Sequence, residues 1–117
     1  MDTDSAIVAL SALSQSTRLE IFRLLVRHEP DGLPAGEVAR QLDLPQNTIS
    51  VHLGTLARAG LLTSQRRSRL IVYRACLARL QELMLFLVKD CCAGNPELCT
   101  PLIADLSACC PSPESCS

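Results

Sequence analysis

The stretch from residue 44 to residue 75 constrains the fold more than any other part of this chain. It opens with an amphipathic pattern in which Ile49, Leu53 and Leu56 fall on one face of a helix. Gly60 follows where a helix end needs a left-handed cap, and two β-prone runs come after it, separated by an arginine-rich segment. A helix that leads directly into a basic-tipped β-hairpin predicts a winged helix-turn-helix, a DNA-binding arrangement.

The distribution of charge supports this prediction. Residues 44–81 contain six arginines and no Asp or Glu, although the whole chain has a formal net charge of −1. Charges interact over only about 8 Å at physiological salt, so the local excess governs attraction to phosphates. The predicted strands cover residues 61–65 and 70–74, and the tip between them, suited to reach phosphates or a minor groove, holds Arg66, Arg67 and Arg69. Arg58 and Arg74 fit a salt bridge or a contact with the DNA backbone equally well.

The polar face of the helix predicted from residue 46 to residue 59 supplies the candidate base-reading side chains. They are mostly short and lie near the helix N-terminus, the part that a recognition helix presents to base edges. The candidates are Gln46, Asn47, Thr48, Ser50, Val51 and His52. For His52 the pattern favours a role in packing or in anchoring the helix, with base contact as the alternative.

Before this stretch the sequence predicts three helices, over residues 4–13, 17–29 and 35–42. We expect Thr3 or Asp4 to cap the first helix. The second should open with a capping box in which Thr17 and Glu20 satisfy early amides reciprocally. The first helix carries apolar residues on one side, namely Ile7, Val8, Leu10 and Leu13.

A last helix is predicted from Leu77 to about Cys92, and it is unusually apolar. Residues 83–88 form an unbroken apolar sextet, which is more than one face of a small domain can bury. We therefore predict a homodimer through this helix, with the first helix alongside it. Two recognition helices related by a dyad would then read a palindromic operator in successive major grooves of double-stranded DNA.

These elements predict a mostly α fold of the α+β class, a winged helix-turn-helix with about five helices and a two-stranded β-wing. Residues 1–93 would form the DNA-binding and dimerisation domain, and residues 94–117 a cysteine-rich tail that completes an effector site. The sequence has no apolar run of the roughly 18 residues that a membrane span needs and no signal segment, so we expect a cytoplasmic protein without membrane contact. It also lacks a nucleophile–base pair, a phosphate loop and paired carboxylates, so we expect neither an enzyme nor an organic cofactor.

All seven cysteines lie from Cys76 onward. An odd number that includes two adjacent pairs, in a chain without a secretion signal, favours reduced thiols over a disulfide scaffold. Cys76 lies between the second predicted strand and the last helix, where we expect a small buried residue.

The other cysteines form two trios. Cys91 and Cys92 can converge on one ion if the helix ends there, as residues 94–96 (Gly-Asn-Pro) indicate, and Cys99 is near enough to add a third sulfur. Three thiolates without a nearby His or carboxylate suit a soft ion such as As(III) or Sb(III), while Zn or Cd with four sulfurs remains an alternative. The second trio is a reserve site, a donor of a fourth ligand, or without function: Cys109, Cys110 and Cys116.

Three runs of the sequence resemble the ArsR/SmtB family of winged-helix metal-responsive repressors: SQSTRLEIFRLL, ISVHLGTLARAGLL and RRSRLIVYRA. The resemblance covers roughly residues 5–90 and implies a homodimer that binds operator DNA when effector-free and releases it when the ion binds. Many arsenic-responsive members carry cysteines in or beside the recognition helix, whereas this chain has none before Cys76. It resembles instead the members with adjacent cysteines at the end of the last helix, which implies Cys91, Cys92 and Cys99 as ligands. The His/Asp ligand pairs of zinc-sensing relatives are missing, since residues 79–90 contain no His.

Two other functions remain open from the sequence. The thiols suit a redox or reactive-sulfur sensor that keeps the DNA-binding part and releases DNA through a reversible disulfide or polysulfide. A third hypothesis is a thiol-rich metal-buffering or delivery protein whose winged helix binds a protein partner. Salt-dependent affinity for DNA would separate this last function from the first two.

Overall fold

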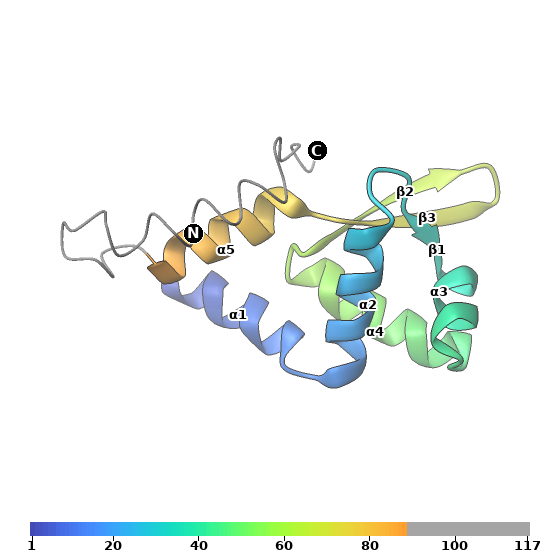
Figure 1. The fold of residues 1–117 in the computed structure, drawn as a ribbon, viewed down its shortest axis with the longest axis horizontal. Coiled ribbons are helices and arrows are strands. Elements are labelled where there is room, and N and C mark those ends of the chain that lie inside the picture. Colours follow the sequence, from blue (N-terminus) through green and yellow to red (C-terminus); the bar gives the residue numbers. More distant parts are fainter. Residues whose placement is uncertain (89–117) are drawn as a thin grey trace.

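The computed structural model describes residues 1–88, and within them five helices surround a three-stranded antiparallel sheet (Figure 1). In chain order the elements are α1 (Thr3–Leu13), α2 (Ser16–Arg27), β1 (Leu33–Pro34), α3 (Ala35–Leu42), α4 (Gln46–Arg58), β2 (Leu62–Arg67), β3 (Leu70–Ala75) and α5 (Leu77–Val88). α1 and α5 lie together at one end, and the β2–β3 hairpin extends from the other end beside α3 (Figure 1). This is the predicted winged helix-turn-helix.

The sheet has one strand more than the two that we predicted. Its order is β1–β3–β2, and the two-residue β1 pairs with β3 through Leu33 opposite Tyr73 and Pro34 opposite Val72. The sequence did not predict β1 because two residues, one of them proline, show no alternating pattern. Each wing strand also ends later than predicted: β2 continues to Arg67, opposite Leu70 at the tip, and β3 continues to Ala75, opposite Leu62.

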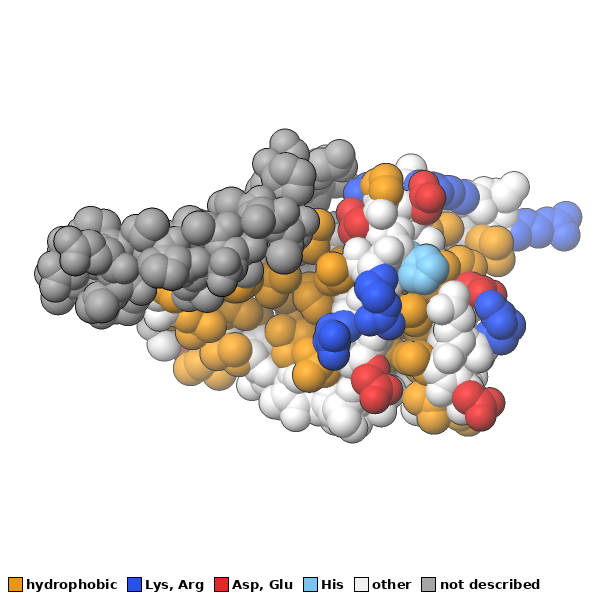
Figure 2. Space-filling model, in the orientation of Figure 1, with side chains coloured by type: hydrophobic (Ala, Val, Ile, Leu, Met, Phe, Trp, Pro, Cys, Tyr) orange, Lys and Arg blue, Asp and Glu red, His pale blue; other side chains and the backbone are white. Residues whose placement is uncertain are grey.

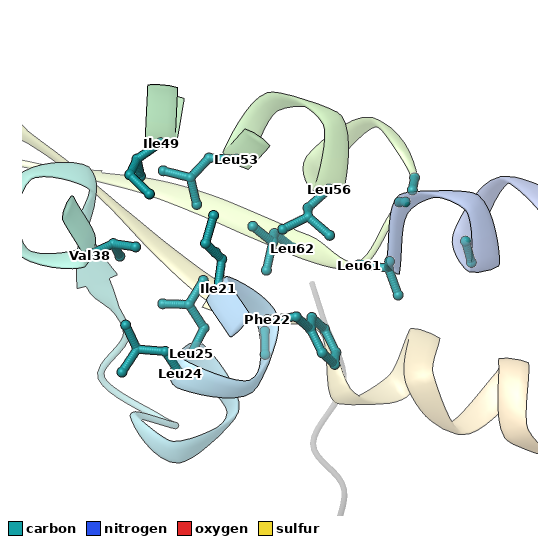
Figure 3. Close-up of a cluster of buried hydrophobic side chains, with 14 of the residues drawn as sticks. Ile21, Phe22, Leu24, Leu25, Val38, Ile49, Leu53, Leu56, Leu61 and Leu62 are labelled. Carbon is teal, nitrogen blue, oxygen red and sulfur yellow. The ribbon is translucent and has the colours of Figure 1, made fainter. Parts of the chain in front are cut away.

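An aliphatic core holds the helices and the sheet together. Side chains from α2, α3, α4 and the start of β2 converge on one another (Figure 3). The predicted stripe on α4 is confirmed, since Ile49, Leu53 and Leu56 are fully buried. Among residues 1–88, the other large side chains that are fully buried are Ile21, Leu25, Val38 and Leu61. The position of α4 is therefore fixed by packing within its own domain.

The helix starts differ from the predicted ones. The carboxylate of Asp2, and not Thr3 or Asp4, caps α1 by accepting from the Ser5 amide at 2.8 Å. α2 begins at Ser16, before the predicted capping box, because the side-chain oxygen of Gln15 accepts from the Arg18 amide at 2.9 Å. In both cases a residue just upstream reaches the free amides of the first turn, so these two predictions were wrong.

At the other end of the described chain, α5 extends to Val88, and its predicted continuation to Cys92 lies outside the described residues. Among residues 1–88, no helix has the length and apolar character that crossing a membrane requires.

Candidate nucleic-acid interface

The turn between α3 and α4 sets the direction of the candidate recognition helix. Asp43 closes α3 in the left-handed region at φ 54°, and its amide donates to carbonyls in the last turn of α3. The Leu44 amide then donates to the Ala39 carbonyl at 3.0 Å, and Pro45 precedes the first residue of α4. Proline disfavours a helical conformation for the residue before it, which helps to keep the two helices separate. α3, this turn and α4 form the helix-turn-helix.

The residues predicted to read DNA lie on the side of α4 away from the core. Five of these side chains are exposed: Gln46, Asn47, Thr48, Ser50 and Val51. Val51 is the most exposed large hydrophobic residue of the described chain, at 67% of its full accessibility. An apolar side chain this exposed among short polar ones suits contact with a thymine methyl group in a major groove.

His52 is placed differently from these five residues. It is half-buried, and its Nδ1 lies 3.4 Å from Nη1 of Arg18 on α2. Nε of Arg18 also donates to the Ala12 carbonyl at the end of α1, at 2.7 Å. Arg18 therefore links α1, α2 and α4. Sequence analysis missed this residue because its partners lie 6 and 34 positions away, beyond any local pattern.

The wing carries the predicted basic tip. Arg66, Arg67 and Arg69 are all exposed, and none forms an ion pair with another described residue. β2 and β3 are joined by a two-residue loop in which Ser68 adopts a left-handed φ of 59°. Blue side chains mark the end of the hairpin in Figure 2. The tip thus presents uncompensated positive charge at the point farthest from α1 and α5.

Arg74, at the other end of β3, has a structural role. Its Nε and Nη2 donate to the two carboxylate oxygens of Glu29 at 3.1 and 2.8 Å, which makes a fork-shaped ion pair. Both side chains are largely buried, at 28% and 15% exposure. This pair joins the segment after α2 to the wing. Of the two roles that the sequence left open for Arg74, a salt bridge or a contact with the DNA backbone, the structure shows the salt bridge. Arg58 stays exposed near the end of α4, where its Nη2 donates to the Thr55 hydroxyl at 3.3 Å.

The glycine that follows α4 lies against an arginine side chain of α5. Gly60 has a φ of 80°, which confirms the predicted left-handed cap after α4. A Cβ at this position would lie 2.9 Å from Nε of Arg79, in the first turn of α5. Gly60 is therefore favoured by its left-handed backbone conformation, and its lack of a side chain leaves room for the Arg79 guanidinium.

The opposite end of the domain has an exposed apolar face made by α1 and α5. α1 packs on the core mainly through three alanines, Ala6, Ala9 and Ala12, and most of its larger apolar residues are exposed. Hydrophobic side chains are visible over this end of the molecule in Figure 2. We call these exposed side chains the α1–α5 face: Ile7, Val8, Leu10, Leu85 and Leu87, each between 41% and 54% exposed.

The predicted effector ligands lie outside the described residues, namely Cys91, Cys92, Cys99, Cys109, Cys110 and Cys116. Within residues 1–88, no group of three or more His, Cys, Asp or Glu side chains is arranged to hold a metal ion. Cys76 is buried as predicted, at 6% exposure, but it is disulfide-bonded, so the prediction of a reduced thiol was wrong there. Pairing of cysteines depends on how the chain folds back, which spacing alone does not reveal.

Comparison with known proteins gives a consistent result. A family profile described as a helix-turn-helix domain matches residues 13–65. The biofilm growth-associated repressor of Xylella fastidiosa is 32% identical over 88 residues, which are 75% of this chain and 75% of that protein. The transcriptional activator HlyU of Vibrio cholerae is 29% identical over 90 residues, 77% of this chain and 81% of HlyU.

Solved structures of transcriptional regulators show the same similarity. An ArsR-like transcriptional regulator from Rhodococcus superposes with a TM-score of 0.69 at 28% identity, covering 92% of this chain and 93% of that one. The structure of reduced HlyU gives a TM-score of 0.59 at 27% identity, over 71% of this chain and 85% of HlyU.

Proposed function

The chain belongs to the ArsR family of winged-helix transcriptional regulators, and from this membership we propose that it is a repressor that releases its operator when As(III) or Sb(III) binds cysteine thiolates. That it is a DNA-binding regulator and not an enzyme follows from its relatives. The operator contacts, the dimer and the effector are our proposal.

For the DNA contact we propose that α4 and the wing have different roles. The exposed α4 residues Gln46, Asn47, Thr48, Ser50 and Val51 would read base edges, with His52 beside them. Arg66, Arg67 and Arg69 would contact phosphates or a minor groove, which fixes the register without reading sequence. The single observation that carries this proposal is the fully buried apolar stripe of α4, because it leaves the polar side of that helix free for DNA.

For assembly we propose that a second copy of the chain covers the α1–α5 face. Two neighbouring helices of this domain leave five large apolar residues exposed, and exposed apolar surface is a feature of protein interfaces. A dyad through this face would place two copies of α4 on the same side of the dimer. The operator would then be palindromic, with half-sites about one helical turn apart.

For the effector we propose the thiolates of Cys91, Cys92 and Cys99, with the second trio as a less favoured set. The donor set itself supports this: sulfur ligands select soft ions, and three of them match the low coordination number of As(III) or Sb(III). In sequence, Cys91 follows the last described residue of α5 by three positions. A change in the packing of α5 at the α1–α5 face would alter the spacing of the two α4 helices. A coupling of about 1–3 kcal/mol weakens the operator complex roughly 5- to 150-fold.

The test is a titration of the dimer–operator complex with arsenite, followed by fluorescence anisotropy. We expect arsenite to weaken operator binding by the wild type roughly 5- to 150-fold. A Cys91→Ser, Cys92→Ser variant should stay bound. A Cys109→Ser, Cys110→Ser variant is the matched control and should respond like the wild type. Unchanged operator affinity at saturating arsenite would contradict the effector proposal and leave the DNA-binding proposal intact.

A redox-responsive repressor is the second candidate, and the disulfide at Cys76 is the observation that favours it. Cys76 directly precedes α5, so oxidation or reduction there acts at the base of the helix that we place in the dimer. This candidate requires that diamide releases the operator, that dithiothreitol restores binding, and that arsenite has no effect on the oxidised protein. Cys76→Ser would remove the response.

A further inference from the structure

The contact between Arg18 and His52 fixes more than the position of α4. Nη1 of Arg18 lies 3.4 Å from Nδ1 of His52, within hydrogen-bond distance. A guanidinium group has only N–H donors, so it can bond to Nδ1 only where that nitrogen carries a lone pair. The ring proton of a neutral imidazole then resides on the other nitrogen. The contact therefore selects the tautomer of His52 that has a proton on Nε2.

The guanidinium is itself held in place by α1. Nε of Arg18 donates to the Ala12 carbonyl at 2.7 Å, in the last turn of α1. The carbonyls of a helix C-terminus lack partners within the helix and carry partial negative charge, so a cation is favoured there. The Arg18 amide also donates to the side-chain oxygen of Gln15, the N-cap of α2, so both the backbone and the guanidinium of this residue are anchored. A donor anchored in this way holds the tautomer more firmly than a mobile side chain would.

The other ring nitrogen is free to meet DNA. Within the described part of the chain, Nε2 of His52 has no hydrogen-bond partner. His52 is half-buried and stands one helical turn after Thr48, which is exposed on the side of α4 that faces away from the core. The arrangement leaves one N–H donor at this position of the recognition surface and no acceptor.

We propose that Arg18 is a positioning residue that holds His52 as an Nε2–H donor toward an acceptor on the operator, either guanine O6 or N7 or a phosphate oxygen. This inference rests on the proposed DNA contact of α4 and adds a specificity element to it. The opposite tautomer would present a lone pair to these acceptors and would be repelled. Arg18 thus tunes the chemistry of a DNA-facing residue without touching DNA.

The first test observes the tautomer directly. In the full-length protein labelled with ¹⁵N-histidine, long-range ¹H–¹⁵N spectra distinguish a protonated Nε2 from a protonated Nδ1. We expect His52 of the wild type to carry its proton on Nε2, and Arg18→Met to give a mixture of both tautomers. Arg23→Met, an exposed arginine on the same helix, is the matched control and should leave the spectrum unchanged. A wild-type ring protonated on Nδ1 alone would overturn the proposal.

The second test measures operator affinity at constant salt. His52→Ala removes one hydrogen bond from each half-site of the proposed dimer, and the loss of both predicts that the operator complex is about 5- to 150-fold weaker. His52→Gln, whose amide nitrogen can donate from a similar place, should recover most of that loss, whereas His52→Asn should not. If all three variants bind like the wild type, the inference fails. If the wild type itself shows no salt-dependent operator binding, the proposed function fails instead, so the two failures are distinguishable.

Operator variants separate the two acceptors. If the acceptor is guanine, His52→Ala relaxes the preference for one base pair in each half-site and leaves the other positions unaffected. If it is a phosphate, the variant weakens all operator sequences equally, and a methylphosphonate at one backbone position abolishes the difference from the wild type. Arg18→Met should reproduce either pattern in weaker form.

Discussion

α1 and α4 are helices of similar length, but they place their large and small side chains on opposite sides. α4 buries large aliphatic side chains and exposes mostly short polar ones, whereas α1 buries three alanines and exposes an isoleucine, a valine and a leucine. Burying a large aliphatic side chain contributes about 1.5–3 kcal/mol, and an alanine contributes far less. α4 is thus held by its own domain, while much of the apolar surface of α1 stays exposed.

This difference matches the proposed partner of each helix, which is DNA for α4 and a second copy of the chain for α1. A helix that reads DNA must keep its orientation whether or not the ligand is present, so its anchor has to lie inside the domain. A helix that forms a dimer keeps large apolar groups outside until a second copy arrives. The remaining described elements follow the same division, with the basic wing on the side of α3 and α4 and the apolar face on α1 and α5.

The largest effect is expected from the α1–α5 face. Ile7→Glu combined with Leu85→Glu places two carboxylates where we propose that two copies meet. Both residues are more than half exposed, so the domain should still fold. Loss of two-site binding lowers operator affinity by about 100- to 10,000-fold, and sedimentation should show a monomer. Leu19→Glu, an exposed leucine on α2, is the matched control. A dimer that survives the double change would refute the assignment of this face.

The next effect concerns the stability of the two helices. Leu53→Ala empties a fully buried site under α4 and should lower the free energy of unfolding by about 2–5 kcal/mol. Ile7→Ala on α1 should change it by less than about 0.5 kcal/mol at concentrations where the protein is monomeric. Urea unfolding followed by circular dichroism measures both. Equal losses for the two variants would mean that α1 is anchored as firmly as α4.

A moderate effect is expected from the wing. Replacing Arg66, Arg67 and Arg69 by Gln leaves up to three phosphates per protomer without a neutralising arginine and does not disturb the core. The slope of log affinity against log salt concentration should fall by about 0.9 for each such phosphate, or by up to about 5.4 for the two wings of the proposed dimer. Arg27→Gln, an exposed arginine on α2, should leave the slope unchanged. A constant slope in the triple variant would show that the wing does not touch the backbone.

The smallest effect is expected at α3. Hydrogen bonds from Arg40 and Gln41 lower the pKa of Glu37 to about 2. A carboxyl with a lowered pKa stabilises the folded state above its ordinary value of 4.5, and that contribution disappears as the pH falls toward 2. Because the pair is exposed, Glu37→Gln should hardly move the urea midpoint at pH 7. An NMR titration of the side-chain carboxyl checks the shift; an ordinary pKa would show that the Arg40 contact does not persist in solution.

Much of the DNA-facing side could be predicted from the sequence. The apolar stripe of α4, the glycine cap after it, the bounds of α3 and the basic wing tip all follow from patterns only a few residues long. Periodicity, turn chemistry and local charge act over those distances, so neighbouring residues are enough to specify them.

The remaining features depend on the path of the whole chain. The third strand exists only because Leu33 and Pro34 meet β3, some 38 or more positions later. The pairing of Arg74 with Glu29 and the contact of Arg18 with His52 join residues 45 and 34 positions apart. Which side of α1 packs inward was likewise decided by the space left beside α2 and α4, which admits alanines and excludes larger side chains. Side chains far apart in sequence act on each other only when packing brings them together, and that is why sequence alone assigned Arg18 no role.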